Sequence, residues 1–208
     1  KNVTVKIRVF LSGNENKEIS IHLKADSRNS EEKHAVRTKT CKLNLEPGIN
    51  DFELVYPMGK GVITWSEFNP ALYDLSVSLS GKDFSDSTSV NFGMRRFSTA
   101  GTQFAINGIT TFLRGKHDAC VFPLTGHPPM DIDSWRRVFQ IAKSYNINFY
   151  RFHSWTPPEA AFAAADIEGI YLQPELPFWG GFSKTRNTDL NEFLLKTGDE
   201  ILENYGNH

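Results

Sequence analysis

The chain has 208 residues, with 23 basic and 24 acidic side chains and a formal net charge of −1. This balance leaves no positively charged footprint for nucleic acid or for an anionic membrane surface, so we expect neither partner. Cys41 and Cys120 fall in different predicted domains, so we expect no disulfide between them. The sequence has no initiator methionine, no signal-peptide pattern and no membrane-spanning run, and we expect it to be an excerpt of a longer protein.

Short runs of alternating apolar and polar residues occupy the first part of the chain. They cover residues 3–9, 19–23, 35–45, 52–56, 72–79 and 87–97, and turn signals such as Pro47-Gly48 separate them. Roughly seven short strands in about a hundred residues are typical of an immunoglobulin-like β-sandwich. We therefore predict such a domain over residues 1–98, followed by a second domain over residues 99–208.

The dipeptide Asn107-Gly108 lies between the apolar runs 103–106 and 109–113. Asn-Gly supplies the two positive φ angles that a type I′ turn requires, so this segment predicts a β-hairpin.

Strand and helix patterns then alternate. Residues 109–113 predict the first strand of a βα series, and the apolar spacing from Trp135 to Ala142 predicts an amphipathic helix that starts at Asp131. Residues 146–175 predict a strand, a helix and a second strand. A third helix is expected around 190–202, after a loop with Trp179, Gly180 and Gly181. Such alternation is typical of a parallel α/β barrel, which has eight units, and we count three here.

The helix within 146–175 has clear end signals. Thr156 and Glu159 predict a capping box, Pro157 and Pro158 suit the first turn, and Gly169 predicts the left-handed stop.

Polar side chains stand where the predicted strands end. Arg151 and His153 follow one strand and Glu175 follows the next, and the carboxyl ends of parallel strands carry the active sites of α/β barrels. We expect Arg114, Arg151 and Glu175 to face a common cavity. Arg151 and Glu175 could equally form a purely structural ion pair at the barrel mouth.

Further residues are candidates for sugar contact. Trp155 and Trp179 could stack on a sugar or simply fill space under loops. His117 and His153 could donate hydrogen bonds; a metal site at them is not predicted, because no companion ligand pattern follows Glu175. We therefore expect no metal and no cofactor.

Several motifs, in this order, resemble landmarks of glycoside hydrolase family 2. They are Trp65, Asn69, Pro70, Leu72 and Tyr73; Phe92-Gly93-Met94-Arg95; Phe104 and Asn107-Gly108; Leu113-Arg114-Gly115; Asn148 with Arg151 and His153; and Asp166 with Gly169 and Glu175. The family includes β-galactosidases, β-glucuronidases and β-mannosidases. The resemblance implies a multidomain β plus α/β fold: an immunoglobulin-like β-sandwich followed by the first three βα units of a truncated TIM barrel.

The resemblance also implies a mechanism. Enzymes of this family retain anomeric configuration and use two glutamates, an acid/base in an Asn-Glu pair on the fourth barrel strand and a nucleophile on the seventh. This chain reaches neither strand. Its own pairs, Asn14-Glu15 and Asn191-Glu192, fall in a predicted loop and a predicted helix. We therefore predict no catalytic carboxylate within it, and a substrate-binding role for Arg151, His153, Glu175, Trp179, His117 and Trp155.

Two functional interpretations remain open. The chain is part of a retaining β-glycosidase acting on a β-linked carbohydrate, or it is a non-catalytic carbohydrate-binding or scaffold module with the same fold. The resemblance favours a periplasmic or extracellular location. Because an unfinished barrel leaves open sheet edges, we also expect self-association.

Overall fold

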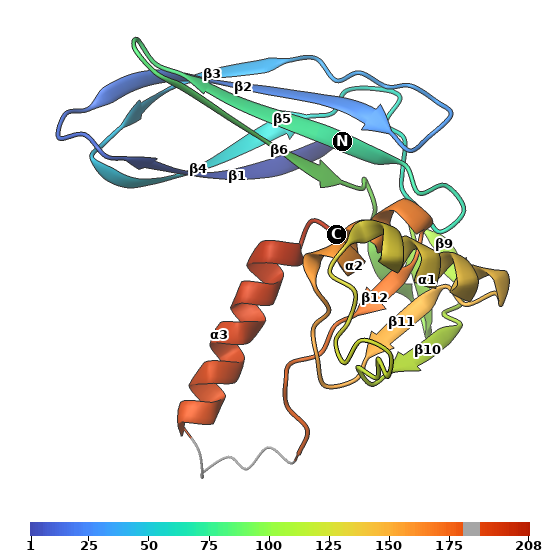
Figure 1. The fold of residues 1–208 in the computed structure, drawn as a ribbon. Coiled ribbons are helices and arrows are strands. Elements are labelled where there is room, and N and C mark those ends of the chain that lie inside the picture. Colours follow the sequence, from blue (N-terminus) through green and yellow to red (C-terminus); the bar gives the residue numbers. More distant parts are fainter. Residues whose placement is uncertain (181–187) are drawn as a thin grey trace. The chain divides into compact units, whose positions relative to one another are not determined.

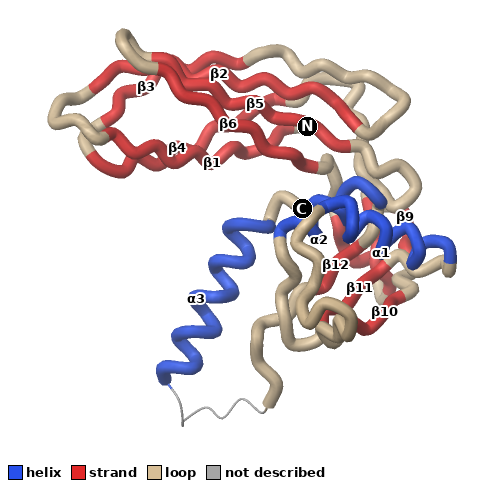
Figure 2. Tube along the Cα trace, in the orientation of Figure 1, coloured by secondary structure: helices blue, strands red, loops and turns tan. Residues whose placement is uncertain are grey.

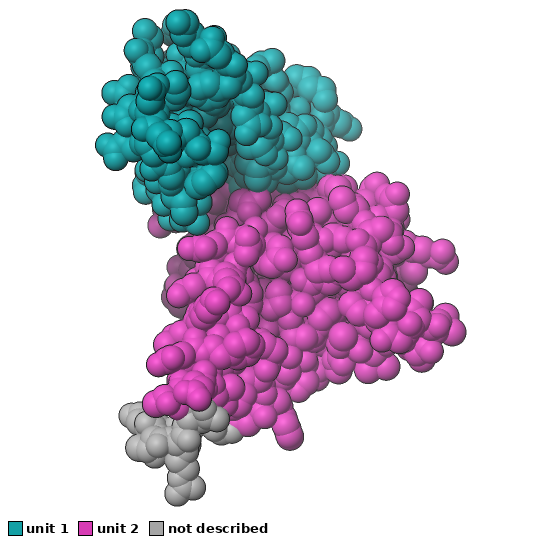
Figure 3. All heavy atoms as spheres, turned by 60° about the vertical axis from the view of Figure 1, so that its left-hand side comes forward, with its two compact units in different colours: residues 1–64, 71–94 teal, residues 65–70, 95–208 magenta. Residues whose placement is uncertain are grey.

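The computed structural model describes residues 1–180 and 188–208 (Figure 1), so predicted loop residue Gly181 lies outside the described part. The chain forms two compact units, coloured separately in Figure 3. Unit 1 comprises Lys1–Thr64 and Ala71–Met94, and unit 2 comprises Trp65–Pro70 and Arg95–His208.

Unit 1 is a β-sandwich of two antiparallel sheets. The smaller sheet pairs β1 (Asn2–Leu11) with β4 (Gly48–Pro57). The larger has the order β3-β2-β5-β6, formed by β2 (Lys17–Arg28), β3 (Lys39–Leu45), β5 (Leu72–Ser80) and β6 (Ser85–Phe92). The alternation read from the sequence thus forms six strands here, where about seven were expected.

The sandwich core lies between these sheets because alternate residues of each strand point inward. Ile19, Ile21 and Leu23 of β2 are at most 1 % exposed, and Leu75, Val77 and Leu79 of β5 join them. Tyr56 is fully buried, and its hydroxyl accepts from the Ala25 amide at 3.1 Å and donates to the Arg37 carbonyl at 3.2 Å. The only polar atom of this large side chain is therefore hydrogen-bonded.

Unit 2 begins with a three-stranded antiparallel sheet of β7 (Phe97–Ala100), β8 (Gln103–Ile106) and β9 (Ile109–Thr111). Asn107 and Gly108 join β8 to β9 with φ angles of 53° and 84°. The predicted type I′ hairpin is confirmed. The interpretation of residues 109–113 as the first parallel strand is wrong, because residues 109–111 pair antiparallel to β8.

The parallel sheet starts later, at β10 (Gly115–Asp118), and continues through β11 (Phe149–Phe152) and β12 (Tyr171–Gln173). Three helices accompany these strands: α1 (Ile132–Ser144), α2 (Glu159–Glu168) and α3 (Thr188–Tyr205) (Figure 2). The predicted strand, helix and strand within 146–175 are confirmed, and β11 and β12 are parallel.

Helices α1 and α2 cover one face of the parallel sheet. Phe139 of α1 meets Tyr150 of β11 edge to face at 5.1 Å between ring centroids, and Trp135 meets Phe152 at 6.0 Å. The small residues Ala161, Ala164 and Ala165 of α2 let that helix approach closely, and they are all buried in the same core.

Two of the three helix-end signals predicted from the sequence are present in the structure. Asp131 caps α1 by accepting from the Ser134 amide at 2.8 Å, and Gly169 ends α2 with a φ angle of 74°, both as predicted. The predicted capping box is wrong. α2 starts after Pro158 without a side-chain cap, because the Thr156 hydroxyl instead donates to the Glu175 carbonyl at 3.0 Å.

Both cysteines are free thiols. Within residues 1–180 and 188–208, no helix is long and apolar enough to cross a membrane.

Candidate active-site edge

The carboxyl ends of β11 and β12 bring Arg151 and Glu175 together. The Nε of Arg151 donates to Oε1 of Glu175 at 2.6 Å, and their side chains are 41 % and 21 % exposed. Arg151 is therefore held at one nitrogen while much of its guanidinium group remains open to solvent. Its remaining donors can reach a ligand's oxygens.

Glu175 is fixed as a carboxylate. Its Oε2 accepts from the backbone amide of Ser154 at 2.8 Å, and this hydrogen bond, followed by the Arg151 contact, lowers the pKa of Glu175. A carboxyl group that stays ionised cannot serve as a general acid near neutral pH. Its geometry suits an anchor for Arg151.

His153 lies directly beside this pair. Its Nδ1 is 3.3 Å from an Arg151 Nη and 3.4 Å from Glu175 Oε2. Both contacts cannot be hydrogen bonds at once. Arginine always donates, so an Nδ1 without a hydrogen accepts from Arg151, and only an Nδ1 that carries a hydrogen donates to Glu175. His153 therefore adds a hydrogen-bonding group beside the Arg151–Glu175 pair.

His117 joins the cluster from β10. The register pairs His117 with Arg151, and the His117 ring stands edge-on to His153 at 4.8 Å between centroids. The sequence placed His117 after a strand, whereas it lies within one. His117 still reaches the predicted site because the first parallel strand is β10, Gly115–Asp118, and not residues 109–113.

The alternation of β11 explains which face carries these groups. Tyr150 and Phe152 point to the helices, so Arg151 points to the opposite face. Gln173 is in register with Arg151 and donates to Glu175 Oε1 at 3.2 Å. Gln173 and the Ser154 amide were missed from sequence. The position of Gln173 two residues before Glu175 was the available signal.

The two candidate tryptophans lie in different environments. Trp155 donates to the Asp118 carbonyl at 3.2 Å, and its ring packs edge-on against Phe152 at 5.1 Å. This packing supports the loop, so a sugar contact by Trp155 stays a prediction. Trp179 is 82 % exposed, which leaves its ring face accessible, and its role also stays a prediction.

Metal binding is not indicated at the edge. Among the described residues, no group of three or more His, Cys, Asp or Glu side chains is placed to hold an ion.

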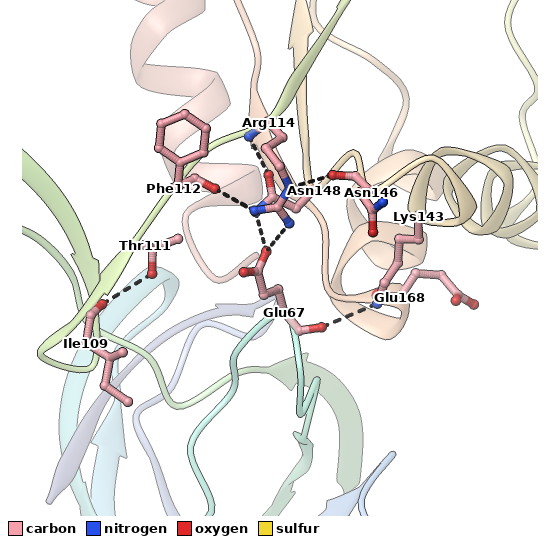
Figure 4. Close-up of polar contacts among 9 residues, drawn as sticks. All are labelled: Glu67, Ile109, Thr111, Phe112, Arg114, Lys143, Asn146, Asn148 and Glu168. Atoms are coloured by element: carbon pink, nitrogen blue, oxygen red, sulfur yellow. Dashed lines mark hydrogen bonds and ion pairs between the residues drawn. The ribbon is translucent and has the colours of Figure 1, made fainter.

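Arg114 does not share this site. It directly precedes β10, and its Nε donates to the Asn146 carbonyl at 2.6 Å, before β11 begins (Figure 4). Arg114 therefore belongs to the amino edge of the parallel sheet, whereas Arg151 and Glu175 lie at the carboxyl edge. The expectation of one cavity shared by all three is wrong.

Asn148 organises that amino edge. Its Oδ1 accepts from the Arg114 amide at 2.7 Å, and its Nδ2 donates to the Phe112 carbonyl at 3.0 Å and to the carboxylate of Glu67 (Figure 4). Asn148 and Glu67 are only 3 % and 7 % exposed. Such a buried, connected polar network fixes the positions at which the strands begin.

A cavity of about 760 Å³ in unit 2 adjoins the polar cluster at Gln173. Its lining includes Phe149, Phe162, Tyr171 and Tyr205, but none of Arg151, His153 or Glu175. We place the candidate site at the cluster because Arg151, His153 and Glu175 meet there at the carboxyl edge of the parallel sheet.

The two Asn-Glu pairs lie where the sequence placed them. Asn14-Glu15 is in the turn between β1 and β2, and Asn191-Glu192 is within α3. Neither lies at the carboxyl end of a parallel strand.

Comparison with known proteins agrees with this architecture. Residues 1–95 match the family model described as "Glycosyl hydrolases family 2". The match covers the β-sandwich. No curated protein matches the sequence.

Solved structures share the fold of the whole chain. They include β-glucuronidase 2 of Bacteroides uniformis bound covalently to cyclophellitol-6-carboxylate aziridine, with a TM-score of 0.85, 17 % identity, and coverage of 100 % of this chain and 25 % of that chain. Another Bacteroides uniformis β-glucuronidase has a TM-score of 0.83, 19 % identity, and coverage of 100 % and 24 %. Parabacteroides merdae β-glucuronidase has a TM-score of 0.74, 21 % identity, and coverage of 100 % and 25 %. At these identities the likeness shows the fold, and the chain spans about a quarter of each structure.

Proposed function

We propose that residues 1–208 are part of a retaining β-glycosidase and form one wall of its sugar site. In this proposal residues 1–98 are an immunoglobulin-like domain and residues 99–208 begin a TIM barrel. The catalytic glutamates come from barrel strands outside this range. The observation that carries the proposal is the Arg151–Glu175 pair, which bridges the carboxyl ends of neighbouring parallel strands with donors left exposed.

The cluster binds and orients substrate. Arg151 donates to sugar hydroxyls or to a sugar carboxylate, while Glu175 and Gln173 hold its position. His117 and His153 add hydrogen bonds from the same face, and Trp155 and Trp179 border it. Binding energy gained here positions the glycosidic bond against carboxylates supplied by later strands.

The 760 Å³ cavity supports this proposal. Phe97 and Phe104 in its lining are 48 % and 45 % exposed, and in this proposal further parts of the barrel would cover such rings.

The test is a panel of nitrophenyl glycosides on the full-length parent protein. A β-glucuronide belongs first, because solved β-glucuronidases share the fold, followed by a β-galactoside and a β-mannoside. We expect turnover of at least one, with NMR showing a first product of retained anomeric configuration. The 208-residue chain alone is expected to show none.

The alternative is a non-catalytic carbohydrate-binding module. It is motivated by the geometry of the cluster, in which Glu175 bonds to Arg151 at 2.6 Å and acts as an anchor for a binding group. Sugar binding by the parent without hydrolysis of any glycoside on the panel would support the module and reject the enzyme.

A further inference from the structure

The two sheets of unit 1 are unequal. One has four strands, β3-β2-β5-β6, and the other has two, β1 and β4. Two sheets of a sandwich cover each other's inner faces, so the outer strand β6 of the larger sheet needs an opposing strand.

The inner face of β6 is uncovered. Asp86, Thr88 and Val90 pair with Leu79, Val77 and Leu75, so they share the face that points into the core. The β5 partners are buried, whereas Val90 is 41 % exposed, and Asp86 and Thr88 are also exposed. The face is oriented inward but lacks a covering layer among the described residues.

The strand β1 has an open hydrogen-bonding edge toward this gap. The Met58 amide donates to the Lys1 carbonyl at 3.0 Å, which fixes the alternation of the antiparallel ladder. Val3, Val5 and Ile7 therefore bond to β4, and the backbone groups of Thr4, Lys6 and Phe10 point to the other edge.

A groove joins these two features. It encloses about 590 Å³, and its lining includes Val9, Phe10 and Leu11 of β1, Leu79 of β5, Thr88 of β6 and Phe84 in the turn between β5 and β6. Figure 2 shows β1 and β6 along the same side of the sandwich. The groove therefore adjoins the open edge of β1 at Phe10 and has an apolar floor.

We propose that a third strand of the β1–β4 sheet occupies this groove, antiparallel to β1, and that the segment of the parent protein immediately before Lys1 supplies it. A short hairpin is the simplest connection between antiparallel neighbours, and it would lead directly into Asn2. The strand carries apolar residues at alternate positions, which cover Val90 and Thr88. The inference rests on the proposed function only in that residues 1–208 belong to a longer protein.

The charges of β1 disfavour a second copy of the chain as the occupant. Antiparallel pairing of two β1 edges near their centres sets Lys6 against Lys6 or against Arg8, and like charges directly opposite are destabilising. We therefore expect neutral or acidic residues on the outer face of the preceding strand.

The first experiment is hydrogen exchange on the unsubstituted parent and on the 208-residue chain. We expect the amides of Thr4, Lys6 and Phe10 to exchange at least ~10-fold more slowly in the parent. Val5 and Ile7 are the internal controls, protected in both. Equal rates for Thr4 and Lys6 in both proteins would overturn the proposal. So would protection that appears in the 208-residue chain as its concentration rises, because a second copy would then be the occupant.

The second experiment compares two proline variants of the parent. Lys6 and Glu53 are directly paired and exposed, and each points its amide away from the other. We expect Lys6→Pro to lower the melting temperature of the parent more than Glu53→Pro, and the two to have similar effects in the 208-residue chain. Equal effects in the parent would reject the strand. Neither experiment measures hydrolysis, so the two proposals can fail separately. If the parent hydrolyses a glycoside but its β1 amides are not protected, only the added strand is rejected. If the amides are protected but no glycoside is hydrolysed, only the enzyme proposal is rejected.

Discussion

Arg151 and Glu175 form an ion pair of 2.6 Å between Nε and Oε1, although 24 residues separate them along the chain. The parallel register of β11 and β12 produces this contact, since both residues leave the sheet at the same edge. The pair is anchored on one side by the Ser154 amide and open on the other.

Substituting Arg151 tests the sugar site. Lysine keeps the charge but loses the planar fork, so it cannot hold Glu175 and reach a ligand together. We expect Arg151→Lys to lower kcat/KM of the parent by roughly 100-fold on its best glycoside. Arg137→Lys, on the exposed face of α1, is the matched control and should leave kcat/KM unchanged. Equal values for the two variants would exclude Arg151 from the site.

The lowered pKa of Glu175 predicts a dependence of stability on pH. A carboxyl group with a depressed folded-state pKa stabilises the fold above its ordinary value of about 4.3, and loses that contribution as pH falls through the lowered value. We expect the melting temperature of the 208-residue chain to fall in acid less steeply in Glu175→Gln than in Glu203→Gln, an exposed change on α3. The contribution of the Arg151–Glu175 pair to the free energy of unfolding should stay below about 1 kcal/mol, because Arg151 is partly solvated. Identical acid profiles would remove the anchoring role of Glu175.

Asn148 should contribute more to the free energy of unfolding than Glu175 does. Asn148→Ala removes the hydrogen-bond partner of the Arg114 amide, the Phe112 carbonyl and the buried Glu67 carboxylate, and we expect a loss of about 2–4 kcal/mol in the free energy of urea unfolding. Asn204→Ala, exposed on α3, should change stability by less than about 0.5 kcal/mol. A loss below about 1 kcal/mol at Asn148 would mean that water replaces its contacts.

A comparison of alanine substitutions at two glycines distinguishes the cost of backbone strain from the cost of a steric clash. Gly101 and Gly169 both have positive φ angles, 61° and 74°, but an added Cβ meets nothing within 4 Å at Gly101 and lies 2.8 Å from the Glu67 carbonyl oxygen at Gly169. We expect Gly101→Ala to cost about 1 kcal/mol and Gly169→Ala to cost about 2–4 kcal/mol in urea unfolding. Equal costs would show that residues near Glu67 move aside without penalty.

The open edge of β12 predicts self-association of the 208-residue chain. The Tyr171 amide bonds to Asn148, so in a parallel ladder the Leu172 amide points to the free edge. We expect light scattering to report a mass above 23.5 kDa, with slower exchange of Leu172 as concentration rises. A stable monomer would count against the assignment of an unfinished barrel.

Much of the local structure could be predicted because neighbouring residues encode it. Asn107-Gly108 dictates its hairpin, Asp131 its helix start and Gly169 its helix end through their own φ preferences and side-chain acceptors. The placement of Arg151 near the end of a strand, and of His153 and Glu175 after strands, also follows from periodicity.

Pairing partners could not be predicted this way. Residues 109–111 have a strand pattern that suits a parallel or an antiparallel neighbour, and the Asn-Gly turn folds them back onto β8. Thr156 could cap a helix, yet its hydroxyl bonds to Glu175, which lies 19 residues away. Glu67 meets Asn148 across 81 residues, and no local pattern predicts that contact.

The sequence by itself thus determined the strand and helix segments, the hairpin and the polar residues at the carboxyl ends of two strands, because turn, cap and burial preferences act over a few residues. The tertiary structure decided which edge each charge occupies, placing Arg114 with Asn148 and Arg151 with Glu175. Among residues 1–180 and 188–208, it pairs β1 and β12 with another strand on one side only. Those outcomes depend on ladder register and burial between distant segments, which only the packed chain establishes.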